Sequence, residues 1–112
     1  MKTIAQFLIE ISDLPDFCEV DIENINSCNI LGDTPLHIAA QWGDIEMIKQ
    51  LLDAGAKIDA QGEYGYTPIH LAITQNKEEA AKYLSQRGAD LNIATNWGDT
   101  AMQLAKKYNI KL

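Results

Sequence analysis

A six-residue motif recurs at a fixed interval along the chain. The copies are GDTPLH at 32–37, GYTPIH at 65–70 and GDTAMQ at 98–103, so their first glycines are separated by 33 residues each time. The same interval relates the Gly-Ala pairs at 55–56 and 88–89. A period of this length indicates stacked supersecondary units, because one such unit cannot bury its apolar face alone.

Each unit has the pattern of two helices and a connecting loop. Thr34 and Thr67 are expected to cap the first helices, with Pro35 and Pro68 at the first helical position, where no amide donor is lost. The second helix carries an apolar stripe. Its expected caps are Asp44 in one unit and, in the next, Asn76 with Glu79 completing a capping box. The residues that follow the Gly-Ala pair are rich in turn formers and predict an extended finger that leads to the next unit.

The segment GDTPLHIAAQWGDIEMIKQLLDAGAKIDAQ resembles an ankyrin repeat almost position for position. The following unit, GYTPIHLAITQNKEEAAKYLSQRGADLNIA, is a clear but less regular match. The resemblance extends from Ile25 to the end, and it is specific because the tetrapeptide, the Gly-Ala pair and the period coincide. It implies an all-α solenoid of helix-turn-helix units with β-turn fingers, which binds other proteins on its concave side.

The repeat register divides the chain, as a single domain of residues 1–112, into four parts. These are an N-terminal cap at 1–28, repeats at 29–61 and 62–94, and a C-terminal half-repeat at 95–112. The first part lacks the tetrapeptide, although its apolar spacing predicts a helix over residues 3–12. In the last part Ala101 and Gln103 replace the proline and histidine. We therefore expect about two full repeats between degenerate caps, since terminal repeats of solenoids are commonly atypical.

The chain is acidic, with nine Lys and Arg residues against sixteen Asp and Glu residues and a net charge of −7. This balance argues against nucleic-acid binding, which depends on neutralising phosphates with cations. It favours a protein partner with a basic surface. Residues 1–33 hold one lysine against seven acids, whereas residues 34–112 hold eight cations against nine acids. The acidic segment is interpreted as a solubilising end or as an electrostatic face for a cationic partner.

The remaining composition indicates a cytoplasmic globular protein. A hydrophobic fraction of 46% is sufficient for a packed core. Cys18 and Cys28 are too few for a disulfide framework and are expected to be reduced thiols. The apolar stretch near the N-terminus is short and lacks a small-residue cleavage site, so we do not expect a signal peptide. No segment approaches the length of a membrane span, and no membrane association is expected.

No motif in the sequence predicts catalysis. His37 and His70 occupy the same repeat position, and in the ankyrin family that histidine is structural and bonds neighbouring backbone groups. A metal site would need convergent ligands and a nucleophile would need an adjacent base, and the sequence supports neither. Nucleotide-binding and hydrolase motifs are absent from the sequence. We therefore expect no enzymatic activity, no cofactor and no metal.

Aromatic residues gather at the variable positions of the repeat, at the finger tips and the exposed end of the first helix. Core positions are small or aliphatic, so these rings are not obviously needed for folding. Large aromatics flanked by acids resemble an interface hot spot with a polar rim, although some rings could simply pack finger on finger. The predicted protein-binding residues are Leu31, Asp33, Trp42, Glu63, Tyr64, Tyr66, Asn96, Trp97, Asp99 and Tyr108.

Two functions follow from these features. The first is a monomeric protein-binding module that masks a basic partner, for example as an inhibitor or an immunity protein of a toxin. The alternative is a scaffold or assembly element that acts through homo- or hetero-oligomerisation. In that case the half-finished third unit would leave one side of the last second helix uncovered, with Ala80, Tyr83 and Leu84 as a possible seam.

Overall fold

A computed structural model describes residues 3–12 and 32–112 of the chain. Within these ranges the elements are α1 (Ile4–Ser12), α2 (Pro35–Trp42), α3 (Ile45–Asp53), the 3-10 turn η1 (Glu63–Gly65), α4 (Pro68–Thr74), α5 (Glu78–Gln86) and α6 (Ala101–Lys107). The described residues contain no β-strand, only an isolated antiparallel bridge between Ala94 and Thr100. The all-α solenoid expected from the repeat is confirmed.

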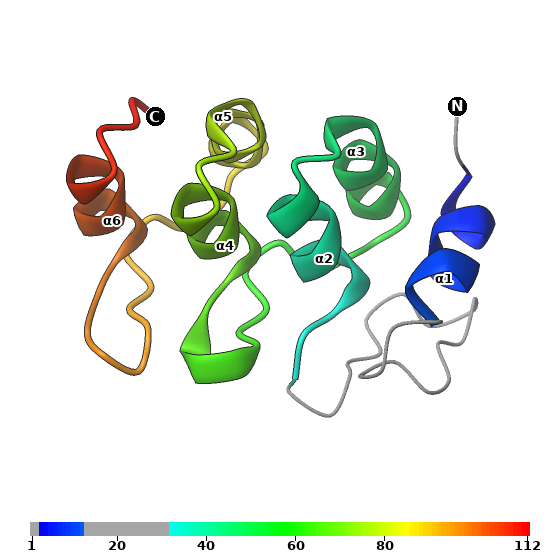
Figure 1. Cartoon of the computed structure of the whole chain (residues 1–112), viewed down its shortest axis with the longest axis horizontal. Helices are drawn as coiled ribbons and strands as arrows, with labels where there is room; N and C mark the ends of the chain where they lie inside the picture. Colours follow the sequence, from blue (N-terminus) through cyan, green and yellow to red (C-terminus); the bar gives the residue numbers. More distant parts are fainter. Residues whose placement is uncertain (1–2, 13–31) are drawn as a thin grey trace.

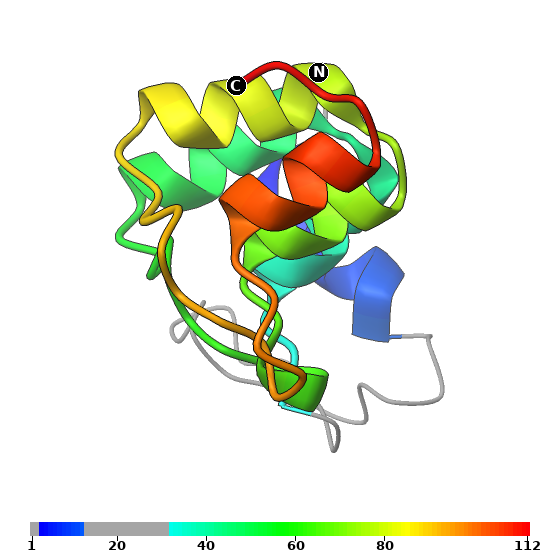
Figure 2. The ribbon, with the colours of Figure 1, turned by 90° about the vertical axis from the view of Figure 1, so that its left-hand side faces the viewer.

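The helices form two layers. α2, α4 and α6 stand side by side in one row, while α3 and α5 form a second row above them (Figures 1 and 2). α1 lies at one end of the stack, in contact with both α2 and α3 (Figure 1). Each unit therefore packs only against its immediate neighbours, which is the arrangement that a 33-residue period predicts.

Every first helix begins with the same hydrogen bond, in which the cap residue's amide donates to the side chain three positions later. The pairs are Thr34 with His37 Nδ1 (3.0 Å), Thr67 with His70 Nδ1 (3.0 Å) and Thr100 with Gln103 Oε1 (2.9 Å). At the start of α1, the Thr3 amide donates to Gln6 Oε1 in the same way, over 2.9 Å. α1 therefore starts like the first helix of a repeat, although the tetrapeptide is missing there.

The turn that follows the first helix of each unit needs one residue in the left-handed conformation. Gly43, Asn76 and Asn109 occupy this position in successive units, with φ angles of 73°, 59° and 59°. Asparagine tolerates this conformation better than most residues. The expectation that Asn76 caps α5 is therefore wrong, because Lys77 takes the N-cap position and makes no capping side-chain bond. Asp44 does cap α3, as expected.

One apolar core runs through the whole stack. Small alanines on α2 and α4 let the first helices approach closely, and larger aliphatic side chains from α3 and α5 close the core from the second row. α1 contributes Phe7 and Leu8 at one end, while Leu104 and Ile110 close the other end. The central residues of this core include Leu36, Ala39, Met47, Ile48, Leu51, Ile69, Ala72, Ile73 and Leu84.

Two loops project from the same edge of the stack, below the first helices (Figures 1 and 2). We call them finger 1 (residues 61–66), which leads to α4, and finger 2 (residues 94–99), which leads to α6. Finger 1 is closed by a hydrogen bond from the Gly62 amide to the Tyr66 carbonyl (2.8 Å). In finger 2 the Thr95 amide donates to the Asp99 carbonyl (2.9 Å).

Candidate functional site

Three aromatic side chains meet on the two fingers, and we call this group the aromatic ridge: Tyr64, Tyr66 and Trp97. The rings of Tyr64 and Trp97 lie 4.8 Å apart with a tilt of 50°, and the side chains are 53% and 62% exposed. Tyr66 is half-buried, with its ring 6.2 Å from Trp97 and stacked at 5.9 Å on His70. The ridge therefore combines one anchored ring with two that face solvent.

Hydrogen bonds between the fingers hold the ridge together. The Asn96 amide donates to the Tyr64 carbonyl over 2.9 Å. The side-chain amide of Gln61 donates to the carbonyls of Ala94 (3.2 Å) and Gly65 (3.1 Å). A Cβ atom at Gly65 would lie only 2.7 Å from the Asn96 side-chain oxygen, so the fingers approach closely here. The backbone segments that carry the two exposed rings are thus held next to each other.

Tyr64 adopts an unusual backbone conformation, with φ 57° and ψ 21°. This left-handed region costs a residue with a side chain roughly 1–2 kcal/mol, and a bulky aromatic is rarely found there. Trp97 occupies the equivalent position on finger 2 without a positive φ. Backbone strain of this kind persists where the surrounding structure imposes it, and it gathers at functional sites.

The acids around the ridge divide into two kinds. Asp33 is buried, with 8% exposure, and its carboxylate accepts a hydrogen bond from the Glu63 amide (3.0 Å). A Cβ atom at Gly62 would overlap that carboxylate, which explains the glycine. Asp99 occupies the same repeat position as Asp33 but is exposed, as is Asn96, and Glu63 is half-buried. Asp33 therefore joins the start of α2 to finger 1, whereas the two acids Glu63 and Asp99, together with Asn96, flank the ridge.

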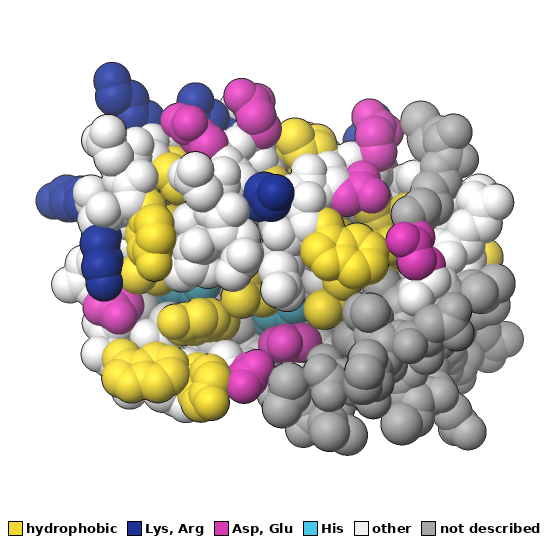
Figure 3. Space-filling model, in the orientation of Figure 1, with side chains coloured by type: hydrophobic (Ala, Val, Ile, Leu, Met, Phe, Trp, Pro, Cys, Tyr) yellow, Lys and Arg dark blue, Asp and Glu magenta, His cyan; other side chains and the backbone are white. Residues whose placement is uncertain are grey.

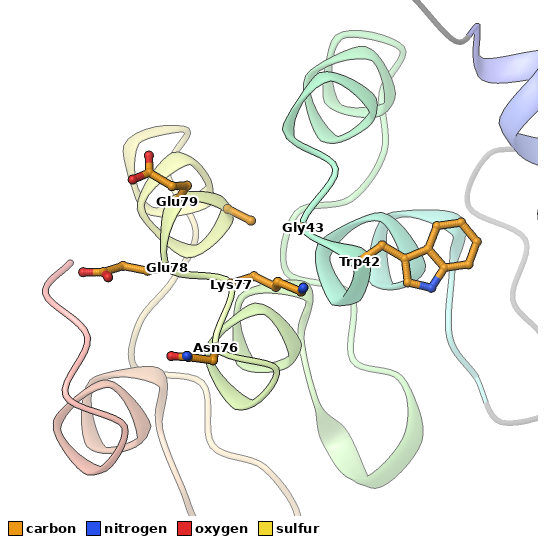
Figure 4. A pocket seen from close by; sticks show the side chains of 7 residues that line it. Trp42, Gly43, Asn76, Lys77, Glu78 and Glu79 are labelled. Atoms are coloured by element: carbon orange, nitrogen blue, oxygen red, sulfur yellow. The ribbon is translucent and has the colours of Figure 1, made fainter.

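Trp42 lies away from the ridge, at the C-terminal end of α2. Its ring packs edge-on against Phe7 of α1, with the centroids 5.8 Å apart and the planes at 86°. It also borders an open groove of about 380 Å³ between the α2–α3 and α4–α5 turns. In Figure 4 the Lys77 side chain reaches across towards Gly43, while Glu78 points away from Trp42. The structure thus separates Trp42 from the finger residues with which the sequence grouped it.

Of the two remaining predicted residues, one lies outside the ridge and the other outside the described part of the chain. Tyr108 is the C-cap residue of α6 and is 40% exposed. Leu31, at the repeat position of Tyr64 and Trp97, lies outside the described residues. The residues that the structure does bring together are therefore Glu63, Tyr64, Tyr66, Asn96, Trp97 and Asp99.

His37 connects a helix start to the next finger. Its Nδ1 accepts from the Thr34 amide, so Nε2 carries the proton, and Nε2 donates to the Tyr66 carbonyl over 2.9 Å. Burial lowers the pKa of His37, while the Tyr66 carbonyl and the Asp33 carboxylate act in the opposite direction. The histidine is neutral and supports finger 1, which agrees with the structural role that the family resemblance implies.

His70 repeats half of this arrangement. Its Nδ1 accepts from the Thr67 amide, but its buried Nε2 has no hydrogen-bond partner among the described residues. Burial lowers the pKa of His70, and the backbone of Asp99 and Ile93 partly offsets that effect. Finger 2 therefore lacks the histidine hydrogen bond that secures finger 1. It is held instead by the hydrogen bonds that join it to finger 1.

The described ranges contain neither a group of potential metal ligands nor a helix that could span a membrane. Among residues 3–12 and 32–112, no three His, Cys, Asp or Glu side chains are grouped so that they could hold a metal ion. The helices in these ranges are also too short or too polar to cross a bilayer. Both cysteines lie outside the described part.

The seam expected for self-assembly is not exposed. Ala80 and Leu84 of α5 are buried, and the segment after α6 adds Ile110 to the same core. Tyr83 is half-buried, and its hydroxyl accepts a hydrogen bond from Arg87 over 2.8 Å. The expectation of a dimer seam is therefore wrong for Ala80 and Leu84, because both side chains are buried.

Charge is distributed unevenly over the molecule. Neither residues 58–76 nor residues 88–105, which include the two fingers, contain a lysine or arginine. In Figure 3 hydrophobic and acidic side chains lie together over the fingers, while lysines and arginines lie over the helices and at the α6 end. Of the acidic N-terminal segment, residues 13–31 lie outside the described part. The finger edge is thus apolar and acidic.

The family model for ankyrin repeats in three copies matches residues 1–95, and the chain belongs to the ankyrin-repeat family. The match begins well before Ile25, where the resemblance was expected to start, and it includes α1 with its repeat-like Thr3–Gln6 bond. Ankyrin repeats generally mediate protein–protein interaction.

A likeness to a larger protein covers about the length of one repeat. A 36-residue stretch, 32% of this chain, is 58% identical to transient receptor potential cation channel subfamily A member 1 of Homo sapiens. The chain covers only 3% of that protein. A match of this extent indicates a shared repeat. It indicates no shared function, because function resides in sites built on a fold.

Proposed function

We propose that this chain binds a partner protein through fingers 1 and 2, with the aromatic ridge at the centre of the interface. The observation that carries the proposal is the pair of exposed rings, Tyr64 and Trp97, held against each other on adjacent fingers. Interface hot spots are enriched in tyrosine and tryptophan and are surrounded by polar residues. Glu63, Asn96 and Asp99 supply that surround.

The partner surface is basic in this proposal. The chain carries a net charge of −7, and the fingers hold acids without a lysine or arginine. Complementary charge of this kind accelerates association and disfavours acidic competitors. The affinity should therefore fall as ionic strength rises, because salt screens exposed charges beyond about 10 Å at 0.1 M.

The most specific form of the proposal is an inhibitor. An acidic recognition surface without chemistry of its own suits a protein that masks a cationic functional surface, such as an immunity protein that neutralises a toxin or nuclease. The charge of the finger edge supports this version. Cytoplasmic location and a monomeric state are part of the same proposal.

The proposal is tested with the full chain as bait in an extract of its own host. After the captured partner is identified, calorimetry compares Tyr64→Ala and Trp97→Ala with Met102→Ala, a control that is 47% exposed on α6 and outside both fingers. We expect each ridge variant to weaken binding by about 2 kcal/mol and the control to bind normally. Normal binding by both ridge variants would refute the proposed surface, and affinity insensitive to salt would refute the basic partner.

A further inference from the structure

We propose that the aromatic ridge receives an arginine side chain of the partner, with the guanidinium group stacked on an exposed ring and paired with the Asp99 carboxylate. This inference rests on the proposed function, because it names the chemical group that the finger surface recognises. It commits to arginine in preference to lysine.

The ridge offers open aromatic faces at its outer edge. The Tyr64 and Trp97 rings are tilted by 50° to each other and are 53% and 62% exposed, so each ring keeps a surface for a ligand. Tryptophan is the best aromatic partner for a cation, and arginine is the cation most often found over such rings.

The surroundings of the ridge favour a positive group. Asp99 is exposed and follows Trp97 by two residues, and Glu63 precedes Tyr64 directly. Since residues 58–76 and 88–105 contain no lysine or arginine, no cation from these segments competes for the carboxylates. An arriving guanidinium would therefore gain both the ring contact and the charge pair.

The chain already accommodates one arginine in this manner, on the second-helix side of the stack. The Arg87 guanidinium lies 5.8 Å from the Tyr83 ring, and it donates to the Tyr83 hydroxyl (2.8 Å) and to the Asp53 carboxylate (3.0 Å). Asp53 comes from the preceding unit, just as the ridge draws on two fingers. A planar guanidinium can stack and bond at once, whereas a lysine ammonium is a compact and strongly hydrated charge.

The two tryptophans of the chain provide a direct test by nuclear magnetic resonance. The ¹⁵N-labelled protein is titrated with the blocked peptide Gly-Arg-Gly-Arg-Gly and, separately, with its lysine counterpart. We expect the Trp97 indole signal to shift with the arginine peptide while the Trp42 indole signal stays in place. The arginine peptide should bind about threefold to fivefold more tightly than the lysine peptide. Asp99→Asn should weaken binding of the arginine peptide, because it removes the charge but keeps the side-chain shape.

The outcomes separate this inference from the proposed function. Equal binding of the two peptides, or a shift of Trp42 in place of Trp97, would overturn the arginine assignment. If the arginine assignment is overturned but Trp97→Ala still lowers the affinity for the identified partner, the proposed binding surface stands and only the choice of arginine is wrong. If Tyr64→Ala and Trp97→Ala both leave partner affinity unchanged, the proposed surface fails and the arginine assignment fails with it.

Discussion

Residues at equivalent positions in successive units of this chain have different structural roles. Asp33 and Asp99 share a repeat position, yet the first is buried against finger 1 and the second faces solvent. Tyr64 and Trp97 also share a position, and only the tyrosine is in the left-handed conformation. A shared position in the repeat therefore determines the location of the residue on the backbone, while the neighbouring residues determine which contacts its side chain makes.

The strain at Tyr64 makes a prediction about glycine and alanine. Both Tyr64→Gly and Tyr64→Ala remove the ring contact with Trp97, but only glycine adopts a φ of 57° without a penalty. Glycine normally destabilises a folded chain relative to alanine, and here we expect the glycine variant to be more stable by about 1 kcal/mol. Urea denaturation measures the difference. An alanine variant of equal or greater stability would mean that the backbone at this position is not strained.

The buried histidines make a prediction about pH. Burial places the folded-state pKa values of His37 and His70 below the unfolded value of 6.5. Below pH 6.5 the unfolded chain then binds more protons than the folded chain. The histidine contribution to stability is therefore complete above that pH, and it is lost as the pH falls towards the folded-state values.

The double variant His37→Gln/His70→Gln isolates this effect. Glutamine makes the corresponding cap bond at Gln6 and Gln103, so the helix starts should be retained. We expect the variant to lose less stability than the native chain between about pH 7.5 and about pH 5.5, as followed by urea denaturation at each pH. Equal losses in the two proteins would assign the acid sensitivity to other groups.

At the scale of the element, the helices depend on the core, and the fingers depend on polar contacts between units. α3 presents Met47, Ile48 and Leu51 to the core, and all three are fully or almost fully buried. Finger 1 instead relies on the Asp33 carboxylate and on the His37 bond to the Tyr66 carbonyl. The two kinds of element should therefore respond to different substitutions.

Truncation in the core should destabilise the whole stack. Leu51→Ala removes a side chain with 0% exposure and leaves a cavity that close-packed neighbours fill only in part. We expect a loss of about 2–5 kcal/mol in the free energy of unfolding. Met102→Ala, at a residue that is 47% exposed, should change stability by less than about 0.5 kcal/mol. Chemical denaturation that gives similar losses for the two variants would contradict the assigned core.

The acids at the shared repeat position should differ in the same assay. Asp33→Ala leaves the Glu63 amide without its carboxylate acceptor, and we expect a cost of about 1–2 kcal/mol. Asp99→Ala should cost less than about 0.5 kcal/mol, because that side chain is exposed. If the two substitutions cost the same, Asp33 does not secure finger 1.

The sequence predicted those features of the elements that depend on local chemistry. The helix starts at Thr34 and Thr67 follow from cap residues and apolar spacing, and both were anticipated. The burial of Asp33, the turn at Asn76 and the burial of Ile110 were not, because each depends on how the chain folds back or on a neighbouring unit. Trp42 was grouped with the fingers by register alone, and its contact with Phe7 was visible only in three dimensions.

At the scale of the whole molecule, the stack separates structure from recognition. The layered helices bury the apolar residues, and the fingers carry exposed rings and acids along one edge (Figure 3). The lysines and arginines of residues 34–112 lie outside the two spans that include the fingers. This separation allows the finger residues to vary without disturbing the core, which is the property that a binding scaffold requires.

The oligomeric state is also a property of the whole molecule, and the burial of the α5 side chains leads to a prediction about it. Since Ala80 and Leu84 are buried, these two side chains offer no surface for self-association through α5. We expect sedimentation velocity to give one species of monomer mass over a wide concentration range. A concentration-dependent shift to a larger species would favour the assembly role over the inhibitor role.

Hydrogen–deuterium exchange on the chain, alone and with its identified partner, locates the interface most directly. We expect new protection in the complex to concentrate in residues 61–66 and 94–99, with α3 and α5 exchanging as they do in the isolated chain. Protection confined to α3 and α5, with both fingers unchanged, would show that recognition takes place on the opposite side and would contradict the central claim.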